Sequence, residues 1–198
     1  AVSIAACLSV LGVFKYAGFL ADTLFYAGLA PVRTFSLVVP VGISFYTFQA
    51  VGYVIDVYRG TQEPEKNILR FALFVSFFPQ LVAGPIERAG DLLPQLRCEA
   101  SFSWERARRG LLRMLWGFFL KLVIADRVAV AVNEVYGNIG FYAGLSVWAA
   151  VGLFAVQIYC DFGGYSQIAV GAAEVMGIEL MQNFDRPYFS HTIQEYWS

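Results

Sequence analysis

Residues 71–86, FALFVSFFPQLVAGPI, form the stretch on which the fold class depends. The stretch is apolar, but a membrane-spanning helix needs about 20 residues, and Pro79-Gln80 and Gly84-Pro85 interrupt this one. A proline removes a backbone donor and leaves a carbonyl without a partner, which lipid does not tolerate but a protein-lined cavity does. We therefore predict a re-entrant segment or a pair of packed half-helices here.

The charges on both sides of this stretch favour a segment that enters and returns on one side of a membrane. Residues 59–70 contain three basic side chains, and residues 87–113 contain six arginines. The positive-inside rule places both flanks in the cytoplasm. The alternative is a proline-kinked helix that spans the membrane once, with an imperfect charge bias.

The composition of the whole chain is that of a membrane protein. Of 198 residues, 58% are hydrophobic and 17% aromatic. Charged residues make up 15%, against about 25% in soluble domains, and the mean hydropathy is +0.58. Disordered chains show the opposite balance, and a net charge of −1 excludes a globally basic nucleic-acid binder. We expect the lipid bilayer, and no nucleic acid, as a partner.

Further apolar runs predict an all-α, polytopic membrane protein with one membrane domain over residues 1–198, incomplete at both ends. The runs cover residues 2–20, 35–58, 111–132 and 141–159. In the second run Pro40 favours a regular helix only after Val39. A basic amphipathic stretch, 99–110, is expected at the membrane surface with Ser103 as its cap.

The last predicted helices are separated by glycines. Asp161-Phe162-Gly163-Gly164 is expected to break the apolar run, and a new helix is expected over residues 165–180. In that helix Ala169, Ala173 and Gly177 recur every four residues, which suits close helix packing in lipid.

Lys121 is the charge placed deepest in a predicted span. If residues 111–132 cross the membrane, Lys121 lies near mid-depth and indicates a functional site. The alternative, which we favour, is an oblique helix whose lysine reaches an interface. Asp126 is five residues further on, about 140° around an α-helix, so the two side chains are not expected to face each other.

Few residues carry an evident chemistry. Cys7, Cys98 and Cys160 are widely spaced and form no metal-binding pattern, so no metal is expected. His191 is the only histidine and is interpreted as a hydrogen-bonded structural or surface residue. Asp161 either caps backbone donors at a helix start or lines a water-filled cavity, and the spacing does not separate these roles.

Four blocks of sequence resemble the membrane-bound O-acyltransferase family, in particular its bacterial alginate O-acetylation branch. In family order they are PVGISFYTFQ with YVIDVYRG at 40–60, FFPQLVAGPI at 77–86, KLVIAD at 121–126, and YCDFGGYS at 159–166 with Asn183-Phe184 and Pro187-Tyr188. The departures are Cys160 where an aromatic residue is common, Gly163 where serine is common, and Ala172-Ala173-Glu174 where Leu-Gly-Arg is usual.

The resemblance implies a ring of kinked or re-entrant helices around a central funnel. It implies transfer of an acyl group, expected to be acetyl, to hydroxyls of an exported polysaccharide or cell-wall glycan. The expected donor is acetyl-CoA or an acyl carrier, used as a substrate, with no bound cofactor. Periplasmic accessory acetyltransferase proteins are expected partners, and the bacterial inner membrane is the expected location, with several crossings.

The resemblance also bears on the site. The family's histidine motifs follow the Tyr196-Trp197 position, so the catalytic histidine is expected beyond Ser198 and His191 inherits no role. Within the chain we predict Gln80, Asp161, Tyr165 and Asn183 as substrate-binding residues of the funnel. For each of them a structural role, as a cap, a helix–helix hydrogen bond or a turn former, is the competing explanation. Alternatives for the whole chain are a transporter or channel subunit that passes acyl groups or polymer, and a scaffolding subunit.

Overall fold

The computed structural model describes residues 2–29, 38–81, 84–85, 87–98, 101–183 and 187–197. Over these residues the chain is helical, with no β-strand, which confirms the predicted all-α class. The chain divides into two compact units. The first unit comprises Ala1–Val82 with Ile86–Cys98, and the second comprises Ala83–Pro85 with Glu99–Ser198. Whether they form one membrane domain stays a prediction.

The first unit contains four α-helices and one short 3-10 helix. They are α1 (Val2–Tyr26), α2 (Ile43–Tyr58), α3 (Ile68–Val75), η1 (Phe78–Gln80) and α4 (Ala89–Arg97). Helix α1 is long and apolar enough to cross a membrane, as predicted from residues 2–20. Most of its large apolar side chains are exposed, which suits contact with lipid. Within this unit α1 packs against α2, and α3 packs against α4.

Helix α2 begins at Ile43, three residues later than Pro40, where the sequence placed the start of the regular helix. Gly42 precedes it with φ 77, a left-handed conformation that favours glycine. A Cβ atom on Gly42 would lie 2.5 Å from the carbonyl oxygen of Leu81. The turn at residues 40–42 therefore fits closely against the chain that follows η1. Residues 35–37 of the predicted run lie outside the described residues.

The break predicted within residues 71–86 is present. Helix α3 ends at Val75 and is followed by the three-residue helix η1, which includes Pro79. The end of α3 frees the carbonyl of Phe74, which accepts hydrogen bonds from the Nε2 atoms of Gln49 (3.0 Å) and Gln80 (3.2 Å). Both glutamines are buried. Residues 82, 83 and 86 of this stretch lie outside the described residues, and its position in a membrane stays a prediction.

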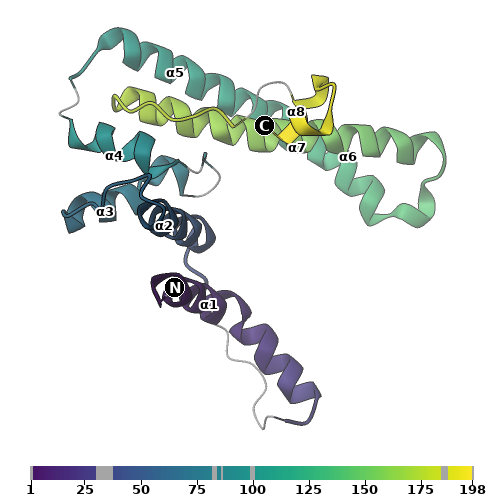
Figure 1. The fold of residues 1–198 in the computed structure, drawn as a ribbon. Coiled ribbons are helices and arrows are strands. Elements are labelled where there is room, and N and C mark those ends of the chain that lie inside the picture. The colour runs from purple at the N-terminus through teal and green to yellow at the C-terminus, as the bar shows by residue number, and fades with distance from the viewer. Residues whose placement is uncertain are drawn as a thin grey trace. The chain divides into compact units, whose positions relative to one another are not determined.

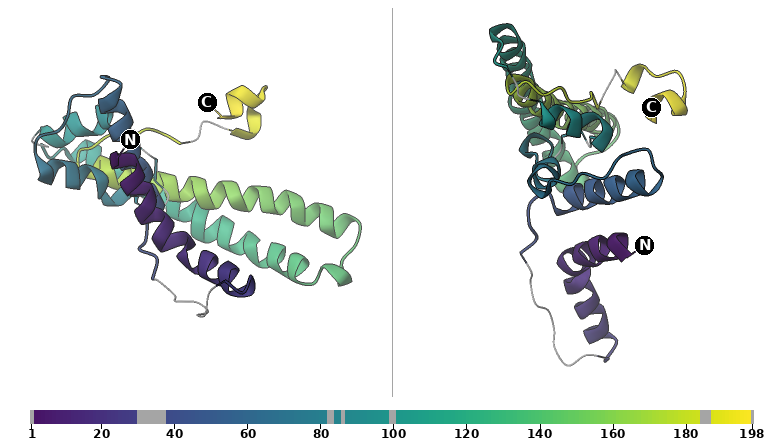
Figure 2. Two further views of the ribbon diagram at one scale, coloured as in Figure 1. Left: turned by 60° about the horizontal axis from the view of Figure 1, so that its bottom comes forward. Right: turned by 60° about the vertical axis from the view of Figure 1, so that its left-hand side comes forward.

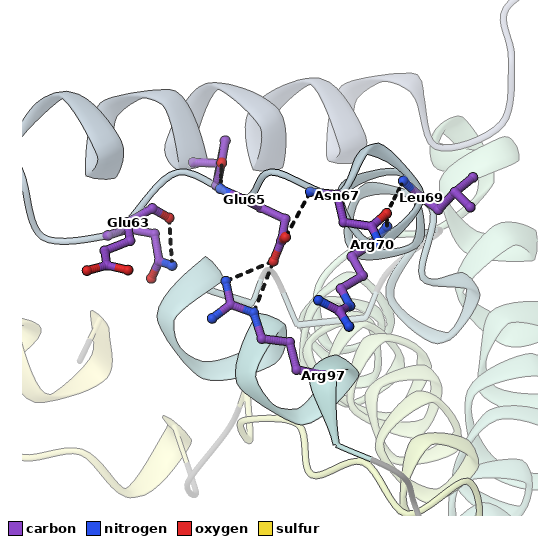
Figure 3. Close-up of polar contacts among 8 residues, drawn as sticks. Glu63, Glu65, Asn67, Leu69, Arg70 and Arg97 are labelled. Atoms are coloured by element: carbon purple, nitrogen blue, oxygen red, sulfur yellow. Dashed lines mark hydrogen bonds and ion pairs between the residues drawn. The ribbon is translucent and has the colours of Figure 1, made fainter.

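Glu65 joins three elements of the first unit (Figure 3). Its backbone N–H donates to the Oη atom of Tyr53 on α2 (2.7 Å), and its carboxylate accepts from Arg97 of α4 (2.8 Å). The carboxylate also accepts the N–H of Asn67, whose own side chain caps the start of α3 by accepting from Leu69 N–H. These contacts fix the loop between α2 and α3 against α4.

The second unit is dominated by a long antiparallel hairpin of helices (Figure 1). One arm consists of α5 (Trp104–Phe118), the π-helix η2 (Phe119–Ala125) and α6 (Asp126–Gly137). The short helix η3 (Ile139–Phe141) leads into the other arm, α7 (Leu145–Val175), which is the second described helix long and apolar enough to cross a membrane. Figure 2 shows α7 lying beside α5 and α6 along their length. The predicted cap of α5 is present, since Ser103 Oγ accepts from Arg106 N–H.

The predicted break at Asp161–Gly164 is wrong, because α7 runs through these residues without interruption. Gly164 is a contact point between helices rather than a helix end. A Cβ on Gly117 would lie 2.5 Å from the Gly164 carbonyl oxygen, and one on Gly164 would lie 2.8 Å from that of Gly117. The two backbones therefore touch, as in other close helix pairs of membrane proteins.

A second glycine pair lies seven residues away on each helix. Cβ atoms on Gly110 and Gly171 would each lie 2.6 Å from the other residue's carbonyl oxygen. Ala169 and Ala173 are buried on α7, as predicted for the small-residue stripe. Gly177 lies beyond the helix end with φ 87. There it forms a Schellman motif, in which Ile178 N–H donates to the Ala173 carbonyl.

The end of the chain returns along α7. After Gly177, residues 178–183 run back beside the hairpin (Figure 1), and η4 (Pro187–Phe189) and α8 (Ile193–Trp197) follow later in the chain. The Tyr188 hydroxyl donates to the carbonyl of Ala155 (2.8 Å), and its ring pairs with that of Tyr159. Residues far apart in sequence are thereby brought to the middle of α7.

The glycine contacts make a stability prediction. Gly164→Ala places a methyl group against the Gly117 carbonyl and is expected to cost about 1–3 kcal/mol of unfolding free energy, the usual range for overpacking. Gly152→Ala is the matched control on the same helix, since nothing lies within 4 Å of its added Cβ. We expect it to stabilise by about 0.5–1 kcal/mol. Thermal unfolding of the full protein in detergent measures both, and equal effects would contradict the close contact.

The Glu65 contacts predict a pH-dependent contribution to stability. The hydrogen bond from Asn67 N–H, and then that from Arg97, lower the pKa of Glu65 below its ordinary 4.5. The stabilisation is therefore complete above about pH 4.5 and is lost as the pH falls through the lower folded pKa. We expect Glu65→Gln to lower the unfolding temperature at pH 7, and the difference from wild type to shrink in acid. Glu63→Gln, an exposed neighbour, should show no such difference at either pH.

Candidate functional site

Three charged side chains meet between the two arms of the hairpin. Lys121 lies on η2, and its Nζ atom contacts Asp161 Oδ1 of α7 at 2.5 Å and Asp126 Oδ1 of α6 at 3.5 Å. The side chain of Lys121 is 34% exposed, that of Asp161 is 53% exposed and that of Asp126 is 51% exposed. The group therefore lies on an open face of the hairpin. One ammonium therefore faces two carboxylates beside a helix that is apolar enough to span a membrane.

The prediction that Lys121 and Asp126 do not face each other is wrong. It assumed α-helical geometry, in which residues five apart point in different directions. Residues 119–125 form a π-helix, whose hydrogen bonds join residue i to i+5, so that residues five apart come to the same side. The Asp126 N–H bonds to the Lys121 carbonyl, and the side chains form an ion pair above it.

The glycine contacts bring Lys121 and Asp161 opposite each other. Lys121 is about one turn beyond Gly117 on one arm, and Asp161 is about one turn before Gly164 on the antiparallel arm. The two charged residues also lie at equal distances from Phe141, 20 positions before it and 20 after it. This symmetry about the polar turn is a sequence signal that could have found the pair, and the favoured interpretation of Lys121 as an isolated interfacial lysine overlooked it.

Of the four predicted site residues, the structure brings Asp161 and Tyr165 together. They are four positions apart on the continuous helix α7, which places them on one face, one turn from each other. Tyr165 is half-buried, whereas Asp161 is exposed beside Lys121. Asn183 is half-buried in the segment that returns from the end of α7.

Gln80 belongs to the first unit and has a structural role of its own. Its amide nitrogen donates to the freed carbonyl of Phe74 (3.2 Å), and the side chain is 2% exposed. Its Oε1 atom is buried and has no hydrogen-bond partner among the described residues. The amide nitrogen of Gln80 therefore stabilises the end of the broken helix, while its Oε1 atom forms no hydrogen bond within the described part of the chain.

His191 belongs to the short helix turn at the end of the chain. Its backbone N–H donates to the Glu195 carboxylate (2.7 Å), and Glu195 N–H donates to Thr192 Oγ1 (3.0 Å). The Thr192 hydroxyl therefore caps the start of α8, while the Glu195 carboxylate binds the residue before that cap. The residue itself is exposed and lines a cavity of about 400 Å³ together with Tyr188 and Tyr196.

Comparison with known proteins identifies relatives of this chain. It is 38% identical over 194 residues, 96% of its length, to the protein of Pseudomonas putida named "Probable alginate O-acetylase AlgI". It is 30% identical to the peptidoglycan O-acetyltransferase of Helicobacter pylori, again over 96% of its length. Over 79% of its length it is 26% identical to the teichoic acid D-alanyltransferase of Bacillus subtilis. The chain is a homologue of the alginate O-acetylases.

These relatives confirm the resemblance to the membrane-bound O-acyltransferase family. The chain spans about 40% of the length of the alginate O-acetylase and similar shares of the other two relatives, 41% and 40%. No protein-family model matches the chain. The homology places the Lys121 group within the region shared with the alginate O-acetylase.

A double-mutant cycle tests whether Lys121 and Asp161 act as a pair. Lys121→Met leaves two carboxylates without their cation, and Asp161→Leu removes the nearer one, so we expect each change alone to destabilise the protein. The double variant should recover part of the loss, with a coupling energy of about 0.2–1 kcal/mol, as expected for a partly exposed ion pair. Asp126→Asn, at the longer distance, should cost less than Asp161→Leu. Unfolding in detergent measures all four, and additive losses would show that the pair is not coupled.

Proposed function

We propose that the chain is part of a membrane O-acyltransferase that transfers an acyl group, most simply acetyl, to hydroxyls of an exported polysaccharide or cell-wall glycan. The observation that carries the proposal is the 38% identity to an alginate O-acetylase over 96% of the chain. The other relatives are named for acyl transfer to peptidoglycan and teichoic acid. The names of these relatives thus have in common the transfer of an acyl group to a polymer, and they differ in the polymer.

The same proposal includes a location and a donor. We place the protein in the bacterial inner membrane with several crossings, and α1 and α7 supply two helices suited to this. Acetyl-CoA or an acyl carrier in the cytoplasm would be the donor. Periplasmic accessory acetyltransferase proteins would complete the transfer outside. A site inside the membrane lets the acyl group cross while the bulky donor stays behind.

The chemistry requires little from the protein beyond positioning and proton transfer. The acceptor oxygen attacks the thioester carbonyl, a C–O bond forms, and the C–S bond breaks. The hydroxyl proton passes to a base and then to the departing thiolate. Asp161 and Tyr165 supply an acceptor and a hydroxyl donor on one face of α7, and we propose that they hold the acceptor sugar. The Lys121 ammonium, in contact with Asp161 Oδ1, holds that carboxylate in place.

Gln80 and Asn183 are proposed as further contacts to substrate. The support for Gln80 is its buried Oε1 atom, which lacks a partner among the described residues and would accept a hydrogen bond from a substrate hydroxyl. The support for Asn183 is its half-buried place on the returning segment of the second unit. Both residues stand in blocks that resemble the family.

Acetylation of exported polymer in cells tests the function. The full protein is expressed in a bacterium that lacks its own polysaccharide O-acetylase, and ester-linked acetate on the exported polymer is measured. We expect esters above the empty-vector level. Their absence, with the protein present in the membrane and its accessory proteins co-expressed, would overturn the proposed function.

Two variants then test the site. Tyr165→Phe removes one hydroxyl without changing shape, and we expect acetylation to fall about tenfold, the loss of one to two kcal/mol for a hydrogen bond to substrate. Asp161→Asn should reduce it at least as much, whereas Asp91→Asn, an exposed carboxylate of α4, should not change it. Full acetylation by both site variants at normal protein levels would remove α7 from the site.

A further inference from the structure

A cavity of about 300 Å³ lies in the first unit, between α2 and the residues that begin α4. Its lining includes the rings of Phe48 and Tyr53 on α2. Four charged side chains also line it: Asp56, Arg59, Glu87 and Arg88. Its size is at the lower end of the range for small-ligand sites. Neither the predicted site residues nor the Lys121 group takes part in it.

Three of the four charged side chains have no partner among the described residues. Arg59, Arg88 and Asp56 form no side-chain hydrogen bond or ion pair with any other residue that the structure describes. Arg97, on the same helix α4, is by contrast held by Glu65 at 2.8 Å. Both free arginines are exposed, so their guanidinium groups can meet a ligand at the mouth of the cavity. Planar guanidinium groups bind phosphate oxygens in pairs of hydrogen bonds.

The carboxylates in the lining determine which kind of phosphate-containing ligand the cavity can bind. Glu87 is 4% exposed and already has a partner in the protein, so Asp56 is the free acceptor. Asp56 is three residues before Arg59 on α2, which places the two on one face of that helix. The lining is neutral overall, with two arginines and two carboxylates. A purely anionic ligand would meet the Asp56 carboxylate, whereas a zwitterion with a phosphate and an ammonium group complements both signs.

The place of the cavity in the fold favours a lipid as the source of that zwitterion. Helix α2 is apolar and ends at Tyr58-Arg59, and Tyr58 is 90% exposed. An aromatic and a basic residue at the end of an apolar helix are typical of the membrane–water interface. Phe48 is 52% exposed on the wall of the cavity and offers an apolar contact for an acyl chain.

We propose that this cavity binds the headgroup of a phospholipid with a primary ammonium, that is, a phosphatidylethanolamine-type lipid. Arg59 and Arg88 bind the phosphate, and Asp56 accepts hydrogen bonds from the ammonium group. The proposal concerns the first unit alone and does not depend on acyl transfer.

Lipid binding to the full protein, purified in detergent, tests this by native mass spectrometry. Phosphatidylethanolamine, phosphatidylcholine and phosphatidylglycerol are added singly at equal concentration, without acyl donor or polymer. We expect the ethanolamine lipid to be retained best, since choline has no N–H to donate and glycerol carries no positive charge. Preference for phosphatidylglycerol would overturn the zwitterion assignment. Equal competition by soluble glycerophosphoethanolamine would overturn the lipid as the source.

Variants separate the two halves of the headgroup. Arg59→Gln with Arg88→Gln should weaken binding of the ethanolamine lipid about tenfold or more, as expected for lost charged hydrogen bonds. Asp56→Asn should keep phosphate binding but abolish the preference for ethanolamine over choline. Arg70→Gln, an exposed arginine of the same unit outside the cavity, is the matched control and should change neither.

The outcome is interpretable even if one variant folds poorly. Thermal unfolding identifies an arginine variant that is misfolded. In that case the lipid preference of the Asp56→Asn variant tests the proposal by itself. Unchanged lipid preference in a folded Asp56→Asn protein would overturn the proposal. Because no acetylation is measured, loss of acetylation activity with intact lipid preference would contradict only the proposed function.

Discussion

The direct contact of two helix backbones sets the geometry of the second unit. Gly117 against Gly164 and Gly110 against Gly171 leave no room for a Cβ atom on either side. With two such contacts seven residues apart, sliding or rotation of one arm would force side chains into carbonyl groups. These contacts therefore fix the register of the two arms without a large core of interlocking side chains. Helices that face lipid lack such a core. The meeting of Lys121 with Asp161 follows from this register.

A second constraint applies to the broken segment of the first unit. A helix that stops inside an apolar region leaves carbonyl groups that water cannot reach. Here the Phe74 carbonyl receives two amide donors, one from α2 and one from η1. The sequence blocks that contain Gln49 and Gln80 are thus linked through one oxygen atom. Gly42 adds a second link between the same blocks, because its turn lies against Leu81.

The sequence predicted the fold class, the break around Pro79 and the cap at Ser103, because these depend on local backbone chemistry and on composition. It failed at Asp161–Gly164, where two successive glycines usually indicate a turn but lie within a continuous helix, and Gly164 serves as a contact between helices. It also failed at Lys121 and Asp126, since a π-helix has no recognised residue pattern and changes which side chains meet. Asp161 lies opposite Lys121 because of the way the two arms of the hairpin pair. Helical periodicity within one arm carries no information about that pairing.

The short distances in sequence from Lys121 to Gly117 and from Asp161 to Gly164 have a consequence for how such sequences vary among relatives. Residues gained or lost in the connection 138–144 leave both arms in register, because that segment only joins their ends. One residue gained or lost between Gly117 and Lys121, or between Asp161 and Gly164, would turn the charged side chain away from its counterpart while the glycines stayed in contact. Length differences should therefore gather at the tip of the hairpin and be absent from these two short intervals.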